Sequence, residues 1–152
     1  LGAAPGGWSQ WVTQRFPNQI QIFALDLLPM APLPGVTFIQ GDFTEPAVLE
    51  QLLRHLNNHP ADLVMSDMAP NISGIKAIDQ PRAMLLAELA RDLARQVLAP
   101  SGHFLTKLFQ GEGFDLYLKD LKTYFKQVVI RKPEASRGRS AEIYVLAKHY
   151  TI

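Results

Sequence analysis

The chain opens on a glycine-rich stretch, Leu1-Gly-Ala-Ala-Pro-Gly-Gly-Trp8, and the next apolar run ends in an acid, Asp26. Residues 2–7 follow a relaxed G-x-A-x-x-G pattern, and a helical stretch begins directly after them. In α/β proteins such a loop joins a strand to a helix, and its small side chains let a nucleotide approach the backbone closely. The stretch favours an open α/β fold with a nucleotide cofactor, although a plain turn satisfies the same pattern.

Short apolar runs and longer amphipathic runs alternate along the rest of the chain, as they do in parallel sheets flanked by helices. The predicted strands are 20–25, 37–40, 62–66, 103–108, 127–131 and 142–147, and the predicted helices are 9–16, 46–56, 81–98 and 114–125. We expect Pro81 in the first turn of the third helix and Pro100-Ser-Gly102 as its stop. The last two strands, separated by residues 132–141, are expected to form an antiparallel hairpin at the edge of the sheet.

Length and composition predict a single domain over residues 1–152. The chain has 152 residues, and 47% of them are apolar, which suffices for one core but not for two. It has no cysteine, so disulfide frameworks and thiolate metal sites are excluded, and a reducing compartment such as the cytoplasm is favoured. No apolar run reaches the length of a membrane span. Because a strand normally feeds such a glycine loop, we expect a first strand upstream of Leu1, so that this chain is N-terminally truncated.

The charges are unevenly distributed. Residues 1–64 carry two basic and five acidic side chains, a net charge of −3, whereas residues 119–140 carry seven basic and two acidic ones, a net charge of +5. A basic segment on an otherwise acidic chain favours a polyanionic partner such as a nucleic acid. A solvated helix face followed by a loop would have the same composition.

Two acids follow successive predicted strands of the first half. Asp26 lies about 20 residues after the glycines, where a carboxylate accepts hydrogen bonds from ribose, and Asp42 follows the next strand. Pro5 removes a backbone N–H that a phosphate would use. The pair therefore favours S-adenosylmethionine over a nicotinamide dinucleotide. Each acid taken alone is also a common turn or helix-cap residue.

Three charged residues lie at predicted strand ends of the second half: Asp67, Lys107 and Glu142. Ligands of open α/β sheets gather at the carboxyl ends of the strands, so Asp67 and Lys107 are expected in one crevice. Lys107 stands within the apolar run Phe104-Leu-Thr-Lys-Leu-Phe109, where an unpaired ammonium group is costly. It needs a carboxylate partner, either in a structural ion pair or in a reaction that removes a proton from a hydroxyl group.

The sequence segments around these residues resemble those of a known family. Ser66-Asp-Met-Ala-Pro-Asn71, Thr106-Lys-Leu-Phe-Gln-Gly-Glu-Gly113 and Ser136-Arg-Gly-Arg-Ser-Ala-Glu142 closely resemble segments of the FtsJ family of RNA ribose 2′-O-methyltransferases. The resemblance covers essentially the whole chain. It implies a Rossmann-like, S-adenosylmethionine-dependent methyltransferase fold with a mostly parallel sheet, an antiparallel edge hairpin and helices on both faces.

The resemblance also implies roles for individual residues. The family's catalytic set is Lys-Asp-Lys-Glu, and Asp67, Lys107 and Glu142 match its last three members, while its first lysine lies upstream of the glycine loop and has no counterpart here. Lys107 would be the base, and Asp67 and Glu142 would position it and the substrate. The residues that would bind the cofactor are Gly6, Trp8, Asp26, Asp42 and Asp67.

Within the family, Asp67-Met-Ala-Pro-Asn-Ile-Ser-Gly74 and Arg131-Lys-Pro133 look like the bacterial branch that methylates a uridine ribose in large-subunit ribosomal RNA. The expected partner is then ribosomal RNA, within the large subunit, bound by a monomer through Lys132, Arg137 and Arg139. The transfer RNA branch of the family, a non-catalytic RNA-binding module and a nicotinamide oxidoreductase are the alternatives. No metal site is expected, because the pair His55 and His59 has no third ligand.

Overall fold

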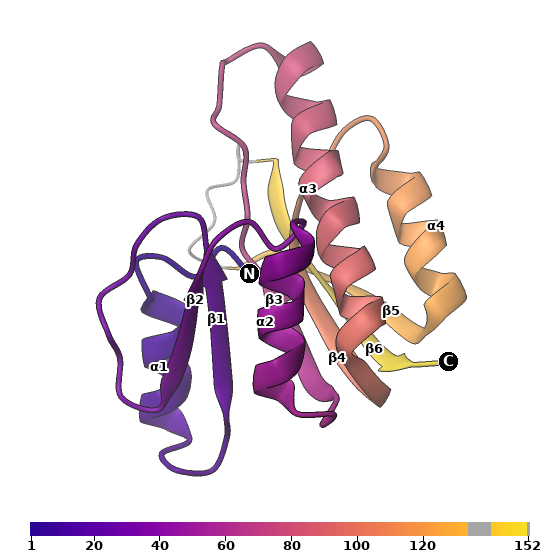
Figure 1. Ribbon diagram of the computed structural model, residues 1–152. Helices are drawn as coiled ribbons and strands as arrows, with labels where there is room; N and C mark the ends of the chain where they lie inside the picture. Colours follow the sequence, from indigo (N-terminus) through magenta and orange to yellow (C-terminus); the bar gives the residue numbers. More distant parts are fainter. Residues whose placement is uncertain (134–140, 152) are drawn as a thin grey trace. The chain divides into compact units, whose positions relative to one another are not determined.

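The structure, a computed structural model, describes residues 1–133 and 141–151 (Figure 1). The chain divides into two compact units, Leu1–Asn58 and His59–Ile152. All six predicted strands and all four predicted helices occur. Among the described residues, no helix is both long and apolar enough to cross a lipid bilayer.

The first unit contains a two-stranded parallel sheet and two helices. Its elements are α1 (Gly7–Arg15), β1 (Ile22–Asp26), β2 (Val36–Gln40) and α2 (Pro46–Leu56). Asp26 lies opposite Gln40 in the register, so both strands end at the same edge of the sheet. Helix α2 has its predicted bounds, because Pro46 fits the first helical position and Asn57 ends the helix in the left-handed conformation.

The second unit is built on a four-stranded sheet with the order β3-β4-β6-β5. Its elements are β3 (Ala61–Ser66), α3 (Lys76–Val97), β4 (Leu98–Phe109), α4 (Phe114–Tyr124), β5 (Phe125–Arg131) and β6 (Glu142–Tyr150). Strands β3 and β4 are parallel, and β6 is antiparallel to both of its neighbours. The predicted hairpin of the last two strands is therefore confirmed, with β5 as its outer strand and β6 as its inner strand.

The core of the second unit lies between this sheet and the two helices in front of it in Figure 1, α3 and α4. Alternate side chains of β4 and β6 point into it and are buried: Phe104, Thr106, Leu108, Ile143, Val145 and Ala147. The Tyr117 hydroxyl donates a 2.7 Å hydrogen bond to the carbonyl oxygen of Ala87, which joins α4 to α3. Because successive strand residues point to opposite faces, Lys107, Tyr144 and Glu142 lie on the face away from these helices.

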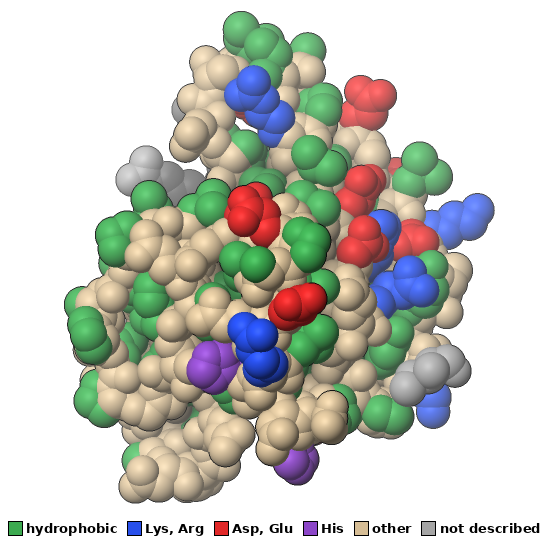
Figure 2. Space-filling view, viewed as in Figure 1, with side chains coloured by type: hydrophobic (Ala, Val, Ile, Leu, Met, Phe, Trp, Pro, Cys, Tyr) green, Lys and Arg blue, Asp and Glu red, His purple; other side chains and the backbone are tan. Residues whose placement is uncertain are grey.

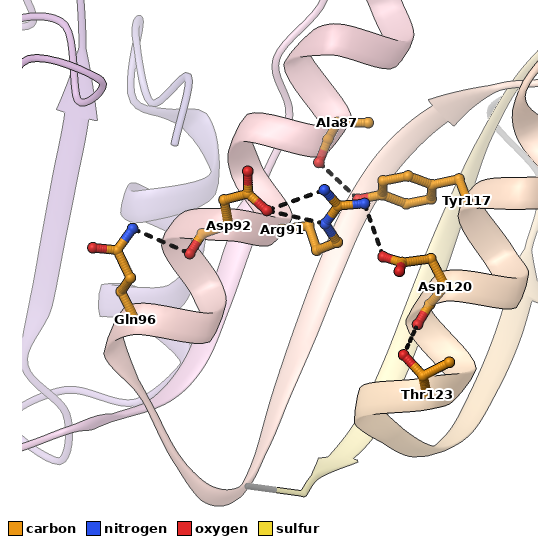
Figure 3. A network of polar contacts seen from close by, with 7 residues as sticks. All are labelled: Ala87, Arg91, Asp92, Gln96, Tyr117, Asp120 and Thr123. Atoms are coloured by element: carbon orange, nitrogen blue, oxygen red, sulfur yellow. Dashed lines mark hydrogen bonds and ion pairs between the residues drawn. The ribbon is translucent and has the colours of Figure 1, made fainter.

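A polar network also joins α3 to α4 on their outer surface (Figure 3). The Arg91 guanidinium group contacts Asp92 at 3.0 Å and Asp120 at 2.8 Å, and it lies 5.8 Å from the centre of the Tyr117 ring. Acidic and basic side chains are interspersed over these two helices (Figure 2). The Arg91–Asp120 contact that joins the two helices is part-buried, whereas the Arg91–Asp92 contact within α3 is exposed and of a kind that contributes about 0–1 kcal/mol.

Two predictions about α3 are wrong. The helix begins at Lys76, so Pro81 lies inside it and not in its first turn. The preceding loop is fastened by Asp79, whose carboxylate accepts hydrogen bonds from the backbone N–H groups of Ser73 and Gly74, and this sets the earlier start. The helix ends at Val97, before the predicted stop, and Pro100-Ser-Gly102 belongs to β4. Ser101 has a φ of 65° there, and the register with β3 shifts nearby, as in a β-bulge.

Candidate active site

A row of polar side chains crosses three neighbouring strands of the second unit. Ser66 pairs with Thr106, so Asp67, which directly follows β3, continues the register next to Lys107. Lys107 in turn lies opposite Tyr144 on β6. Paired residues of neighbouring strands share a face of the sheet, so the backbone register alone aligns Asp67, Lys107 and Tyr144.

The structure brings the three sequence-predicted residues of this unit together. The Nζ atom of Lys107 lies 3.1 Å from Oδ1 of Asp67 and 3.7 Å from Oε2 of Glu142. Glu142 pairs with Phe109, two residues beyond Lys107, which places it on the same face. The Lys107 side chain is 13% exposed, and those of Asp67 and Glu142 are 31% and 33% exposed. The ammonium group thus has the carboxylate partners that its apolar strand requires, and the carboxylates stay open to a ligand.

Tyr144 is part of this cluster, although it is not among the site residues predicted from the sequence. Its hydroxyl donates a 2.9 Å hydrogen bond to Oδ1 of Asp67, the oxygen that also faces Lys107. Burial raises the pKa of Tyr144, and the hydrogen bond to Asp67 raises it further, so the phenol stays protonated near neutral pH. The signal was available: Tyr144 stands two residues after Glu142 in a strand and therefore on the same face.

The loops that follow β3 and β4 are both fastened to the beginning of α3. The side-chain amide of Gln80 donates hydrogen bonds of 3.0 Å to the carbonyl oxygens of Phe109 and Glu112. Gly111 packs so closely on this amide that a Cβ atom there would lie 2.9 Å from Cδ of Gln80. The carboxyl end of β4, beyond Lys107, is thereby held in place by side chains that do not belong to the charged cluster.

The glycine-rich loop of the first unit lies at the end of β1. The backbone N–H of Ala3 donates to the carbonyl oxygen of Leu25 at 3.1 Å, and the N–H of Ala4 donates to Oδ2 of Asp26 at 2.8 Å. Gly6 precedes α1 with a φ of 117°, a conformation that disfavours any other residue. A Cβ atom at Gly6 would also lie 3.1 Å from Cδ1 of Leu33, a tight contact that adds to the conformational preference for glycine.

The two predicted cofactor acids differ in how fully their oxygens are used. Asp26 accepts a backbone hydrogen bond on each oxygen, from Ala4 at 2.8 Å and from Leu28 at 2.9 Å. Asp42 accepts from the N–H and the hydroxyl of Thr44, both on Oδ1, and these bonds lower the pKa of Asp42. Both acids thus have the turn role that the sequence left open. Each carboxylate oxygen has two lone pairs, so both acids retain capacity to accept from a ligand.

The other predicted site residues are more dispersed. Trp8 is half-buried at the start of α1, and Lys132 follows β5 and is exposed. Arg137 and Arg139 lie outside the described residues.

An open hollow of about 430 Å³ in the first unit is lined by Thr13, Phe16, Leu33 and neighbouring residues, and it contains none of the predicted cofactor residues. Within the described ranges, no group of three or more His, Cys, Asp or Glu side chains is arranged to hold a metal ion.

The geometry described above agrees with a comparison against known protein families. The model of the FtsJ-like methyltransferases matches residues 1–150. The chain belongs to the FtsJ-like methyltransferase family. Curated relatives of this FtsJ-like chain are named ribosomal RNA large subunit methyltransferase E. That of Chromohalobacter salexigens is 61% identical over 150 residues, and that of Cellvibrio japonicus is 58% identical, each match covering 99% of this chain and 71% of the relative.

Solved structures with the same fold include other methyltransferases. A crystal structure described as a ribosomal RNA methyltransferase of Plasmodium falciparum is 27% identical, with a TM-score of 0.88 over 98% of this chain and 83% of that one. Human methyltransferase-like protein 13, solved in complex with SAH, is 18% identical, with a TM-score of 0.70 over 98% of this chain and 69% of that one. The predicted Rossmann-like methyltransferase fold is thereby confirmed.

Proposed function

We propose that this protein transfers a methyl group from S-adenosylmethionine to the 2′-hydroxyl of a uridine ribose in large-subunit ribosomal RNA. The observation that carries the proposal is the position of Lys107, held between two carboxylates at strand ends of an FtsJ-like chain. The names of the relatives support ribosomal RNA of the large subunit as the substrate. The choice of the ribose hydroxyl rests on the family resemblance of the segments around Asp67, Lys107 and Glu142. The choice of uridine rests on the resemblance of residues 67–74 and 131–133 to the bacterial branch.

In the proposed reaction, Lys107 accepts the proton of the 2′-hydroxyl. Its amine acts as a base only when it is itself deprotonated, and its nearly buried position limits competition from water. Asp67 orients the amine from 3.1 Å, and Glu142, at 3.7 Å, has an oxygen near enough to position the amine or the ribose. Holding the hydroxyl in line with the methyl donor supplies much of the rate enhancement.

The residues of the first unit fit an adenosine cofactor without phosphates. Asp26 and Asp42 offer carboxylate oxygens, which suit the hydroxyl and amino groups of adenosine, and Pro5 contributes no N–H to an anion site. S-adenosylmethionine supplies an electrophilic methyl group when it is bound. We propose that Gly6, Trp8, Asp26, Asp42 and Asp67 bind it. We also propose that residues 1–152 form one methyltransferase domain.

Replacing Asp42 with alanine should weaken the binding of S-adenosylmethionine by about 1–3 kcal/mol, because a polar group of the cofactor would lose its acceptor. Isothermal titration calorimetry measures this directly. Thr44→Ala is the matched control, since it removes the hydroxyl that donates to Asp42 but keeps the carboxylate. Equal affinities for wild type and Asp42→Ala, with both proteins folded, would leave Asp42 with its turn role only.

RNA binding is proposed to use the cations at the end of β5, namely Arg131 and Lys132, together with Arg137 and Arg139. Arg131 is exposed and lies opposite Tyr144, so it extends the row that contains Lys107 toward the edge of the sheet. Arginine and lysine side chains commonly contact the phosphates of nucleic acids. Residues 119–140, which include these cations, have a net charge of +5.

Changing Arg131 and Lys132 together to alanine should lower the slope of log affinity against log salt by about 1.5, since each lost phosphate contact removes somewhat less than one unit. Fluorescence anisotropy with a labelled ribosomal RNA fragment gives the slope. The double variant Lys119→Ala/Lys122→Ala removes the same charge from α4, which covers the other face of the sheet. A similar loss in both variants would indicate diffuse attraction and no docking site at the end of β5.

The function itself is tested with radiolabelled S-adenosylmethionine and three acceptors: free large-subunit ribosomal RNA, large subunits lacking the modification, and transfer RNA. Label in a uridine 2′-O-methyl group of ribosomal RNA supports the proposal. Label in transfer RNA alone would favour the other branch, and RNA binding without transfer would favour a binding module. We propose that the protein is a cytoplasmic monomer. We also propose that its acceptor is ribosomal RNA within the large subunit.

A further inference from the structure

We propose that Tyr144 is a positioning residue. Its hydroxyl donates a hydrogen bond to Asp67, withdraws part of the negative charge of that carboxylate and thereby sets the pH at which Lys107 becomes a base. The inference rests on the proposed function for its catalytic meaning. The coupling between Tyr144, Asp67 and Lys107 is present in the structure whether or not the protein transfers a methyl group.

The contact geometry is the first argument. The Tyr144 hydroxyl lies 2.9 Å from Oδ1 of Asp67, and Nζ of Lys107 lies 3.1 Å from the same atom. A tyrosine hydroxyl has one proton to donate, and here it is directed at the oxygen that faces the base. Asp67 is thus held from two sides, by a neutral donor on β6 and by the amine on β4.

The charge balance around Lys107 is the second argument. Asp67 and Glu142 both place negative charge beside the amine, at 3.1 and 3.7 Å. Arg131 on β5 lies one strand further, opposite Tyr144, and α3 and α4 cover the other face of the sheet. A hydrogen bond from Tyr144 draws electron density from Asp67 and weakens its hold on the proton of Lys107. Because the phenol stays protonated near neutral pH, this effect is present over the working range.

Removing only the hydroxyl, in Tyr144→Phe, should raise the pH at which Lys107 loses its proton by about half a unit to one unit. The rate of methyl transfer at neutral pH should fall about three- to tenfold and recover as the pH is raised, because alkaline solution again deprotonates the amine. The titration is followed by NMR of lysine labelled with ¹³C at Cε, and Lys107→Arg identifies the signal. This readout does not require activity, so it also decides the matter if wild type transfers no methyl group and the proposed function fails.

The matched control is Tyr150→Phe, which removes another hydroxyl from β6, one that donates to the carbonyl oxygen of Arg95 at 3.3 Å. It should leave both the Lys107 titration and the pH profile unchanged. A second measurement covers the case in which Tyr144→Phe fails to fold: protein made with fluorotyrosine has stronger phenol donors, and its Lys107 should lose the proton at lower pH. If Lys107 titrates alike in these proteins and in wild type, or if Tyr144→Phe lowers the rate equally at every pH, the inference is overturned.

Discussion

Lys107→Ala is expected to lower the rate of methyl transfer by about 100-fold or more, the scale of a lost general base. The variant removes the amine that lies 3.1 Å from Asp67 and 3.7 Å from Glu142, and nothing else in the cluster can take its place as a neutral base. Single-turnover kinetics with saturating cofactor measure the chemical step and separate it from product release.

The affinity for S-adenosylmethionine should change little in Lys107→Ala, which calorimetry can verify. Lys148→Ala is a suitable control because Lys148 lies on the same face of β6 as Tyr144 and makes no ion pair among the described residues. A Lys107→Ala protein that turns over at a near-normal rate would contradict the assignment of the base and leave Lys107 as a structural ion-pair residue.

The largest effect on stability is expected for Phe104→Ala, with a loss of about 3–5 kcal/mol in the free energy of unfolding. Phe104 is fully buried on the helix-facing side of β4, and its ring lies 6.3 Å from that of Phe125. Urea denaturation followed by circular dichroism measures the loss. Leu116→Ala, at a position that is 74% exposed on α4, removes a comparable apolar side chain and should cost little.

The same experiment tests the proposal that residues 1–152 act as one domain. Both tryptophans, Trp8 and Trp11, belong to the first unit, whereas Phe104 belongs to the second. If the chain unfolds as one cooperative domain, Phe104→Ala should shift the tryptophan fluorescence transition as far as the circular dichroism transition. A fluorescence transition that stays at its wild-type midpoint would show that the two units unfold independently.

The sequence predicted those features that depend on local patterns. Apolar runs located the strands, and charged residues at their ends located Asp67, Lys107 and Glu142, because strand ends of an α/β sheet are where ligands gather. Tyr144 was missed, although its spacing of two residues from Glu142 predicts a shared strand face. Its contact with Asp67 does not follow from that spacing, because it depends on the pairing of β6 with β4 and joins residues 77 positions apart in sequence.

The start of α3 was missed for a related reason. Proline usually marks a first turn, so Pro81 was placed there. In the structure, Asp79 fastens the loop before the helix and Gln80 fastens the loop after β4, and the helix begins at Lys76. Such side-chain contacts over five to thirty-two positions do not follow from propensity. The cofactor acids illustrate the converse, since their turn roles are local and were among the alternatives that the sequence left open.

The strand order β3-β4-β6-β5 has a consequence for how the protein is made. A ribosome releases β5 before β6, yet among the described strands β5 pairs only with β6, so a nascent chain ending near residue 131 presents two unpaired sheet edges. The row of Asp67, Lys107 and Tyr144 is incomplete during that interval, because Tyr144 follows residue 131 in the chain. Addition of Tyr144 and Glu142 to the charged cluster and pairing of β5 into the sheet therefore both require β6, and a chain stalled before β6 exposes unpaired edges that favour aggregation.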